Sequence, residues 1–190
     1  MPITRIVSGG QTGADRGGLD AAIYCDLPHG GWCPKGRKAE KGTIPAQYQL
    51  TEMPSDDYLV RTEANVVDSD ATLIFSQGPL EGGSLRTAEF AEKHGRPWLH
   101  VDLESCTRKK AIDDIADWLA GKYPTDAGTV PPKECVLNVA GSRATKAPGI
   151  DRQVMIYMVD VISKVNGKLF YPIQEERMFT GKEDDPHLLR

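Results

Sequence analysis

The chain has 190 residues, which is enough for one domain that buries roughly 70% of the surface of the unfolded chain. It carries 23 basic and 27 acidic side chains, and this net charge of −4 argues against a protein whose main role is to hold a nucleic-acid backbone. The sequence contains no run near the ~18 apolar residues of a membrane span and shows no signal peptide. We therefore expect a cytoplasmic location, without a membrane or nucleic-acid partner.

The first predicted strand, Thr4–Val7, runs directly into a glycine-rich turn and then into a predicted helix, Arg16–Cys25. The first turn of a helix leaves backbone N–H groups without intrahelical acceptors, and these groups favour an anion. The turn has neither the G-x-G-x-x-G pattern of dinucleotide-binding proteins nor the Gly-Lys-Ser/Thr of a Walker loop.

The side chains of this turn favour phosphate binding. Gly9, Gly10 and Gly13 allow the close approach and positive φ that such a loop needs, while Gln11 and Thr12 offer side-chain hydrogen bonds. We interpret the turn as a phosphate cradle. The alternative is a tight strand-to-helix turn in which a polar side chain caps the helix.

The segment after this helix is less regular. A short strand is plausible over residues 29–32, although glycine weakens it. Residues 34–42 form a predicted loop with four positive charges, which either covers an anionic ligand on the first loop or is a solvated surface turn. Residues 44–57 show no clean period, and apolar residues at helical intervals then predict a helix over 58–69.

A second strand, glycine loop and helix follow. Ala71–Phe75 is a continuous apolar run typical of a buried strand, and it leads into a glycine loop over residues 76–84. The helix Leu85–His94 comes next, and Trp98–Asp102 is predicted as the following strand.

The same unit occurs a third time near the C-terminus. A helix over residues 108–120, capped by Thr107, precedes a polar connection over 121–132. Cys135–Ala140 is predicted as a buried strand that enters a glycine-flanked loop, residues 141–149.

The last predicted helix, Asp151–Val165, is apolar nearly all round, so it is either deeply buried or shared with a second subunit. From the second reading we predict a dimer or higher oligomer. The tail from Asn166 shows little period, and we expect one domain over residues 1–165 and an exposed tail over 166–190.

The four cysteines form no C-x-x-C pair and sit at irregular spacings, which predicts reduced thiols. His29 and Cys33 lie four residues apart and would supply half of a metal site. Because no second pair accompanies them, we expect no protein-bound metal centre.

Alternating strands and helices with short turns predict a single-domain α/β protein, a Rossmann-like three-layer α/β/α arrangement with a mainly parallel sheet. In such sheets ligands bind beyond the carboxyl ends of the strands, near the point where strand order reverses. We expect the strands at Ile6, Ile74 and Leu137 to be neighbours, with their glycine loops facing one cavity.

The residue types in these loops suit a phosphorylated ligand. Backbone N–H groups and hydroxyl donors bind phosphate oxygens, and arginine or lysine neutralises the charge. If the protein is an enzyme, Glu89 and Asp15 are the candidate acidic groups, and a magnesium ion is possible. The candidate ligand-binding residues are Gly9, Gly10, Gln11, Thr12, Gly13, Asp15, Gly82, Gly83, Ser84, Thr87, Gly141, Ser142, Arg143 and Lys146.

Four motifs together resemble the molybdenum carrier family, a branch of the Rossmann-like SLOG superfamily that also contains the DprA and LOG proteins. The resemblance extends from about residue 3 to 165, and it implies a fold that binds a nucleotide or similar ligand and is usually oligomeric. For this branch it implies storage or protection of the molybdenum cofactor, a phosphorylated pterin. The motifs are Ser8-Gly9-Gly10-Gln11-Thr12-Gly13-Ala14-Asp15, Arg61-Thr62-x-x-Asn65-x-x-Asp68-Ser69-Asp70, Gly82-Gly83-Ser84-x-x-Thr87 and Asn138-Val139-Ala140-Gly141-Ser142-Arg143.

The LOG branch implies an alternative, the hydrolysis of nucleoside monophosphates to base and ribose phosphate. Its pattern is Pro-Gly-Gly-x-Gly-Thr-x-x-Glu, and this chain departs from it. Glu81 stands in place of the proline, Thr87 comes one residue late, and Phe90 occupies the position of the glutamate, next to Glu89. A carrier of a phosphorylated pterin or nucleotide is therefore our first expectation, and a hydrolase or a nucleotide-sensing module is the alternative. Trp32, Tyr48 or Tyr58 would set selectivity for the ring of the ligand.

Overall fold

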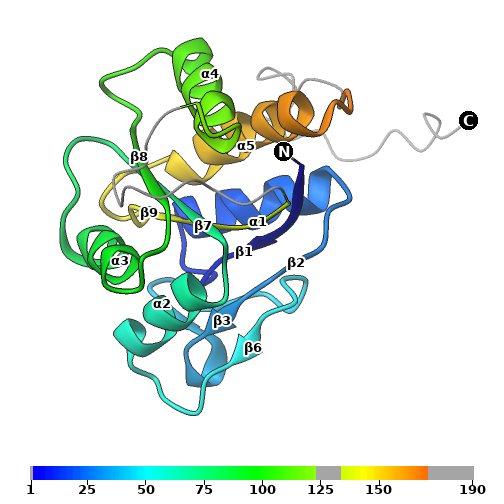
Figure 1. Cartoon of the computed structure of the whole chain (residues 1–190). Helices are drawn as coiled ribbons and strands as arrows, with labels where there is room; N and C mark the ends of the chain where they lie inside the picture. Colours follow the sequence, from blue (N-terminus) through cyan, green and yellow to red (C-terminus); the bar gives the residue numbers. More distant parts are fainter. Residues whose placement is uncertain (1, 123–133, 171–190) are drawn as a thin grey trace, which may run out of the picture.

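The structure is a computed structural model that describes residues 2–122 and 134–170. Within these residues, five parallel strands form the central sheet in the order β2-β1-β9-β7-β8. The strands that carry the three glycine loops are β1, β9 and β7, and they are neighbours, as predicted (Figure 1). The bounds of the strands are β1 (Ile3–Val7), β2 (His29–Gly30), β7 (Ala71–Ser76), β8 (Trp98–Asp102) and β9 (Cys135–Gly141).

Helices cover both faces of this sheet. α1 packs against α5, which also contacts α4, and α2 packs against α3. Figure 1 shows α4 and α5 on one side of the sheet and α2 and α3 on the other, which gives the expected three-layer, Rossmann-like α/β arrangement. The bounds are α1 (Ala14–Tyr24), α2 (Tyr58–Val67), α3 (Gly82–Lys93), α4 (Arg108–Leu119) and α5 (Ile150–Asn166).

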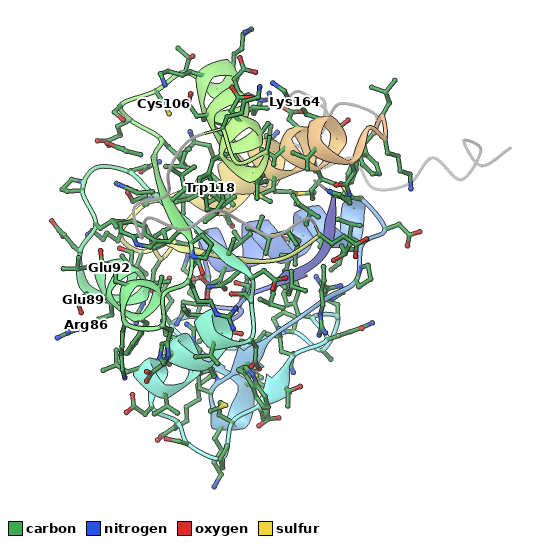
Figure 2. All side chains as sticks on the ribbon, in the orientation of Figure 1. Arg86, Glu89, Glu92, Cys106, Trp118 and Lys164 are labelled. Carbon is green, nitrogen blue, oxygen red and sulfur yellow. The ribbon has the colours of Figure 1, made fainter. Side chains whose placement is uncertain are left out.

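The core forms where the apolar strands meet the helices. All six residues of β7 are buried, which explains why that strand reads as a continuous apolar run. Trp118 of α4 is among the largest fully buried side chains, and Figure 2 shows it on the inner side of that helix. As predicted, Thr107 caps α4 by accepting a hydrogen bond from the backbone N–H of Lys110.

The short strand expected over residues 29–32 is divided in two. β2 joins the central sheet, whereas β3 (Trp32–Cys33) pairs with β6 (Thr51–Glu52) in a separate two-stranded sheet. The chain changes direction at Gly31, whose φ is +118° and where a Cβ atom would lie 2.4 Å from the backbone oxygen of Ser8. Only glycine fits this turn.

Residues 32–57 form a small lobe beside the main sheet. It contains the 3₁₀ turn Lys35–Arg37 and a hairpin made of β4 (Lys38–Ala39) and β5 (Gly42–Thr43). Arg37 donates hydrogen bonds to four backbone carbonyl groups of the lobe. A second small core of Leu19, Cys33, Ile44 and Tyr48 lies beneath the lobe. Such contacts between distant residues require no regular spacing of apolar residues, which explains why the sequence of residues 44–57 has no clean period.

Most element boundaries differ from expectation by one to three residues, and two of the differences have a visible cause. α3 begins at Gly82 rather than Leu85, because Glu81 is the N-cap and its backbone N–H donates a hydrogen bond to Ser84 Oγ (3.3 Å) in a capping box. α5 includes Asn166, the first residue of the expected tail, and Asn166 bonds both the N–H and the carbonyl oxygen of Ile3 (2.8 and 2.9 Å). Phe170 also packs against the core, and residues 171–190 lie outside the described part of the chain.

The apolar side chains of α5 are buried within the chain. Val154, Met158 and Ile162 are fully buried between α1, α4 and the sheet. Of the two readings of this helix, deep burial therefore applies, and α5 supplies no argument for a subunit interface. The oligomer stays a prediction.

Candidate functional site

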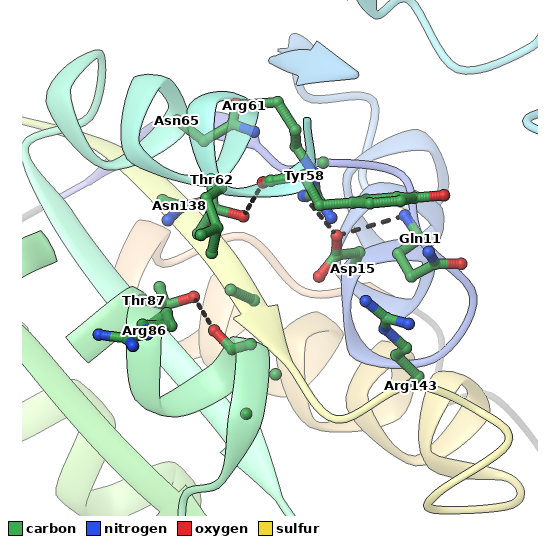
Figure 3. A pocket seen from close by; sticks show the side chains of 16 residues that line it. Gln11, Asp15, Tyr58, Arg61, Thr62, Asn65, Arg86, Thr87, Asn138 and Arg143 are labelled. Atoms are coloured by element: carbon green, nitrogen blue, oxygen red, sulfur yellow. Dashed lines mark hydrogen bonds and ion pairs between the residues drawn. The ribbon is translucent and has the colours of Figure 1, made fainter. Parts of the chain in front are cut away.

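The loops after β1, β7 and β9 open at the same edge of the sheet and surround a cavity of about 230 Å³ (Figure 3). A second cavity of about 250 Å³ adjoins it and shares Gly82, Gly83, Gly141 and Arg143. We call the first the inner cavity and the second the outer groove. The inner cavity is lined by Gly9, Gln11, Asp15, Tyr58, Leu59, Arg61, Thr62, Asn65, Gly82, Gly83, Arg86, Thr87, Asn138, Ala140, Gly141 and Arg143.

Eleven of the fourteen expected ligand-binding residues line one of the two cavities, and Ser84, Ser142 and Lys146 do so in the outer groove. The exceptions are Gly10, Thr12 and Gly13. Gly10 faces the small core, where a Cβ atom would lie 2.5 Å from Leu50. The convergence of the three loops at one rim follows from the parallel sheet, because the carboxyl ends of neighbouring parallel strands meet at one edge.

A buried ion pair forms one wall of the inner cavity. Arg61 Nη1 lies 3.0 Å from Asp15 Oδ2, which also accepts a hydrogen bond from the backbone N–H of Gln11. A Cβ atom at Gly9 would lie 1.1 Å from Arg61 Nη1, so the guanidinium occupies the space that any other residue at position 9 would fill. Gly9 is therefore required by Arg61, and Asp15 is engaged in holding this wall.

The N-terminus of α1 is covered by the chain itself. The backbone N–H of Thr12 donates to Gln11 Oε1, and that of Ala14 donates to the carbonyl oxygen of Ser142 (3.0 and 3.1 Å). A Cβ atom at Gly13 would lie 2.3 Å from the same Ser142 oxygen. The loop after β9 therefore packs on the first turn of α1, where the sequence predicts the phosphate.

The first turn of α3 remains open. Gly82 and Gly83 line both cavities, and a Cβ atom at either position would meet nothing within 4 Å. Because the first N–H groups of a helix lack intrahelical acceptors, this turn offers donors to an anion. The glycine loop after β7, rather than the one after β1, carries the accessible helix terminus.

The loop of residues 34–42 contacts the glycine loops after β1 and β9 through a carboxylate, and two of its basic residues are engaged elsewhere, which favours the surface-turn reading. Arg37 is engaged by backbone carbonyls, and Lys38 pairs with Asp56. Glu40 instead accepts hydrogen bonds from the hydroxyls of Thr12 and Thr145 and from the backbone N–H of Thr145. Burial raises the pKa of Glu40, but these hydrogen bonds outweigh it and lower the pKa below its usual value.

Two cations border the outer groove. Lys146 Nζ lies 2.5 Å from Glu81 and lowers the pKa of that carboxyl. The guanidinium of Arg143 lies 5.5 Å from the centre of the Tyr58 ring, a cation–π contact. Four cationic side chains, Arg61, Arg86, Arg143 and Lys146, and two carboxylates line the two cavities. Arg61, Arg86 and Lys146 each pair with a carboxylate, so the positive charge left to attract an anion is chiefly that of Arg143.

Glu89 does not reach the cavity. It pairs with Arg86 at 2.6 Å with 44% of its side chain exposed, and Figure 2 shows it on the outer face of α3. Glu89 is two residues after Thr87, about 200° around the helix axis, so it points away from the cavity that Thr87 lines, and it lines neither cavity. The geometry therefore gives no support to Glu89 as the acid of a hydrolase.

Sequence reasoning missed Leu59 and Arg86, and it named Tyr58 only as one of three aromatic residues that would set selectivity for the ring. It listed the other lining residues outside the fourteen only as parts of motifs, namely Arg61, Thr62, Asn65, Asn138 and Ala140. Asn138 carried a readable signal, since an amide inside an otherwise apolar strand needs a partner; it bonds Thr72 at 3.3 Å. The sequence carries no signal for the ion pair of Arg61, because its partner Asp15 is 46 residues away along the chain.

No group of three or more histidine, cysteine or acidic side chains in the described residues is placed to hold a metal ion. All four cysteines lie in the described residues and are free thiols. Cys33 packs in the small core, and His29 contacts the backbone of Gln47 and Gln49. Among the described helices, none has the length and apolar character needed to cross a bilayer.

Comparison with known proteins gives two matches. A model of the circularly permuted YpsA family of SLOG proteins matches residues 6–162. A crystal structure from Syntrophus aciditrophicus, named "putative molybdenum carrier protein", is 48% identical in sequence, with a TM-score of 0.74. The alignment covers 84% of this chain and 94% of that one. No curated protein matches the chain.

Proposed function

The chain belongs to the circularly permuted YpsA family of SLOG proteins, and we propose that it binds and carries a phosphorylated small molecule, a pterin such as the molybdenum cofactor or a nucleotide. The observation that carries this proposal is the pair of adjoining cavities at the rim of the sheet. Their lining contains more cationic side chains than carboxylates. The solved relative supports the pterin, since it bears the name of a molybdenum carrier.

The outer groove suits the phosphate of such a ligand. The open first turn of α3 offers backbone N–H groups at Gly82 and Gly83, and the helix dipole adds to their attraction for an anion. Arg143 and Lys146 supply positive charge at the same groove. A doubly charged phosphate would compete with Glu81 for Lys146.

A molybdenum ion held directly by thiolates fits the site poorly. No cysteine lines either cavity, and burial raises the pKa of Cys25 to about 11 and that of Cys135 to about 12. The backbone N–H groups and cationic side chains of the site suit an organic phosphate. We therefore propose that the protein binds molybdenum as cargo, through the phosphate and ring of the cofactor that holds the metal. A magnesium ion would have to reach the site with the phosphate, because Asp15 is already paired with Arg61.

The hydrolase alternative receives less support. It needs an acidic group free to meet the substrate, whereas Glu89 lies outside the cavities and Asp15 is engaged by Arg61 and Gln11. Incubation with a panel of nucleoside monophosphates should therefore release no free base. Release of base that Asp15→Asn abolishes, in a variant that remains folded, would favour the hydrolase.

The carrier is tested by mass spectrometry of small molecules that remain bound through native purification, together with pterin fluorescence. We expect a phosphorylated pterin or nucleotide at near-stoichiometric amount. Arg143→Ala should lower its affinity about tenfold or more, since it removes a charged partner of the phosphate. Lys109→Ala, on the exposed face of α4, is the matched control and should leave the affinity for the ligand unchanged. An empty wild-type protein that also takes up no added molybdenum cofactor would remove the proposal.

A further inference from the structure

Three aromatic side chains were candidates for reading the ring of a ligand, and the structure separates them. Trp32 donates its indole N–H to Asp68, and the hydroxyl of Tyr48 donates to Asp20 from within the small core. Tyr58 alone of the three lines the inner cavity. It opens α2, directly after the cap Asp57.

The ring of Tyr58 faces Arg143 across the mouth of the cavity. The two side chains come from α2 and from the loop after β9, and the guanidinium lies 5.5 Å from the ring centre (Figure 3). Within the described chain, no hydrogen bond holds the Tyr58 hydroxyl. The ring makes a cation–π contact with Arg143, and a planar group can stack on the same π-face.

The same wall carries two donors that lack an acceptor in the described structure. Gln11 Nε2 and Arg61 Nε have no hydrogen-bond partner, although the residues are only 4% and 9% exposed. Buried polar groups are normally paired, and an unpaired donor is costly. Both atoms have almost no accessible surface, so an occupant that presents acceptors would satisfy them only after a small rotation of these side chains, and one that presents an amino group would not.

We propose that Tyr58 determines the specificity of the site by stacking on a flat heterocycle whose inward edge carries acceptors. Adjacent carbonyl oxygen and ring nitrogen atoms, as in guanine and in oxidised pterins, have this character, and adenine presents an amino group in place of the oxygen. This inference rests on the proposed function, with the ring in the inner cavity and the phosphate in the outer groove. The two cavities share Arg143, so a ligand of ring, linker and phosphate spans both.

The test is isothermal titration with four probes: guanosine 5′-monophosphate, adenosine 5′-monophosphate, 6-hydroxymethylpterin monophosphate and ribose 5-phosphate. Wild-type protein should bind the guanine or the pterin compound at least tenfold more tightly than the adenine compound and ribose 5-phosphate. Tyr58→Leu should weaken the preferred ring compound about tenfold, which corresponds to about 1.4 kcal/mol, and leave ribose 5-phosphate unchanged. Tyr58→Phe keeps the π-face and should bind like wild type.

The outcomes separate the two proposals. If none of the four probes binds the wild type, the proposed function fails with these ligand classes. If they bind but Tyr58→Leu weakens ribose 5-phosphate as much as the ring compound, Tyr58 only supports the fold and the inference is overturned. If the adenine compound binds as tightly as the guanine and pterin compounds, or more tightly, the proposal that the inward edge of the ring carries acceptors is overturned. Should Tyr58→Leu fail to fold, the preference of the wild type and of Tyr58→Phe among the four probes decides.

Discussion

At the scale of single residues, Gly9 shows how a missing side chain shapes the site. The Arg61 guanidinium fills the space where a Cβ atom would stand, and it reaches Asp15 through that space. The glycine at this position is therefore explained by the packing of an arginine from α2, and the freedom of the backbone is not needed to account for it.

We predict that Gly9→Ala destabilises the protein by about 3 kcal/mol or more, because the methyl group displaces Arg61 and leaves a buried charge without its partner. Urea denaturation measures the change. Gly83→Ala is the matched control, since nothing lies within 4 Å of its Cβ position, and it should stay within about 0.5 kcal/mol of wild type. Similar midpoints for the two variants would contradict this account of Gly9.

A second prediction concerns the partner of Arg61. Asp15→Asn should cost about 3–5 kcal/mol, because removing one member of a buried ion pair leaves the other uncompensated. Glu89→Gln breaks an exposed pair on α3 and should cost less than about 1 kcal/mol. A double-mutant cycle of Asp15→Asn with Arg61→Met should show strong coupling, and additive effects would sink the prediction.

At the scale of elements, α4 and α5 are joined by a carboxylate. Hydrogen bonds from Lys164 of α5 and from Lys109 of α4 lower the pKa of Asp113 from 3.8 to about 2. A carboxyl whose pKa is lower in the folded state contributes stability above its unfolded pKa, and this contribution is lost as pH falls through the folded pKa. The contribution of Asp113 is thus complete above about pH 5 and is lost as the pH falls through about 2, the pKa of the folded state.

We therefore predict that Asp113→Asn is less stable than wild type at pH 6 and that the difference shrinks between pH 4 and pH 2. Thermal unfolding followed by circular dichroism across this range checks it. Asp114→Asn is the control, because the Asp114 pair joins two residues of α4 only. A difference between Asp113→Asn and wild type that stays constant with pH would speak against the bridge.

The elements also show what sequence reasoning can reach. The order of strand, glycine loop and helix predicts β1, β7 and β9 as neighbours, because apolar runs and turn residues are local signals. The sequence did not predict that α3 begins as early as Gly82, because glycine residues such as Gly82 and Gly83 have low helix propensity. Contacts between distant segments determine the fold of the lobe of residues 32–57 and the position of Glu40. No local sequence pattern predicts such contacts.

At the scale of the whole molecule, the two ends of the described chain meet. Asn166 bonds both backbone groups of Ile3, and Phe170 packs on the core. We predict that a chain ending at residue 165 unfolds several degrees lower than one ending at residue 170. Calorimetry distinguishes them, and equal transitions for the two truncated chains would place the domain boundary at 165 after all.

The predicted dimer or higher oligomer also belongs to this scale. Because α5 is buried within the chain, an interface would have to use another surface. Light scattering should give a mass of at least twice the 20.8 kDa of the chain. A strictly monomeric mass across the concentration range would contradict the prediction.

Strand β9 has the central position in the sheet and is the last of the described strands to be synthesised. Until residues 135–141 leave the ribosome, β1 and β7 each keep an open edge in what will become the middle of the sheet. The nascent chain can therefore close its central sheet only after residue 141 has left the ribosome. An incomplete translation product is expected to be a substrate for chaperones or to aggregate, rather than to survive as a smaller folded unit.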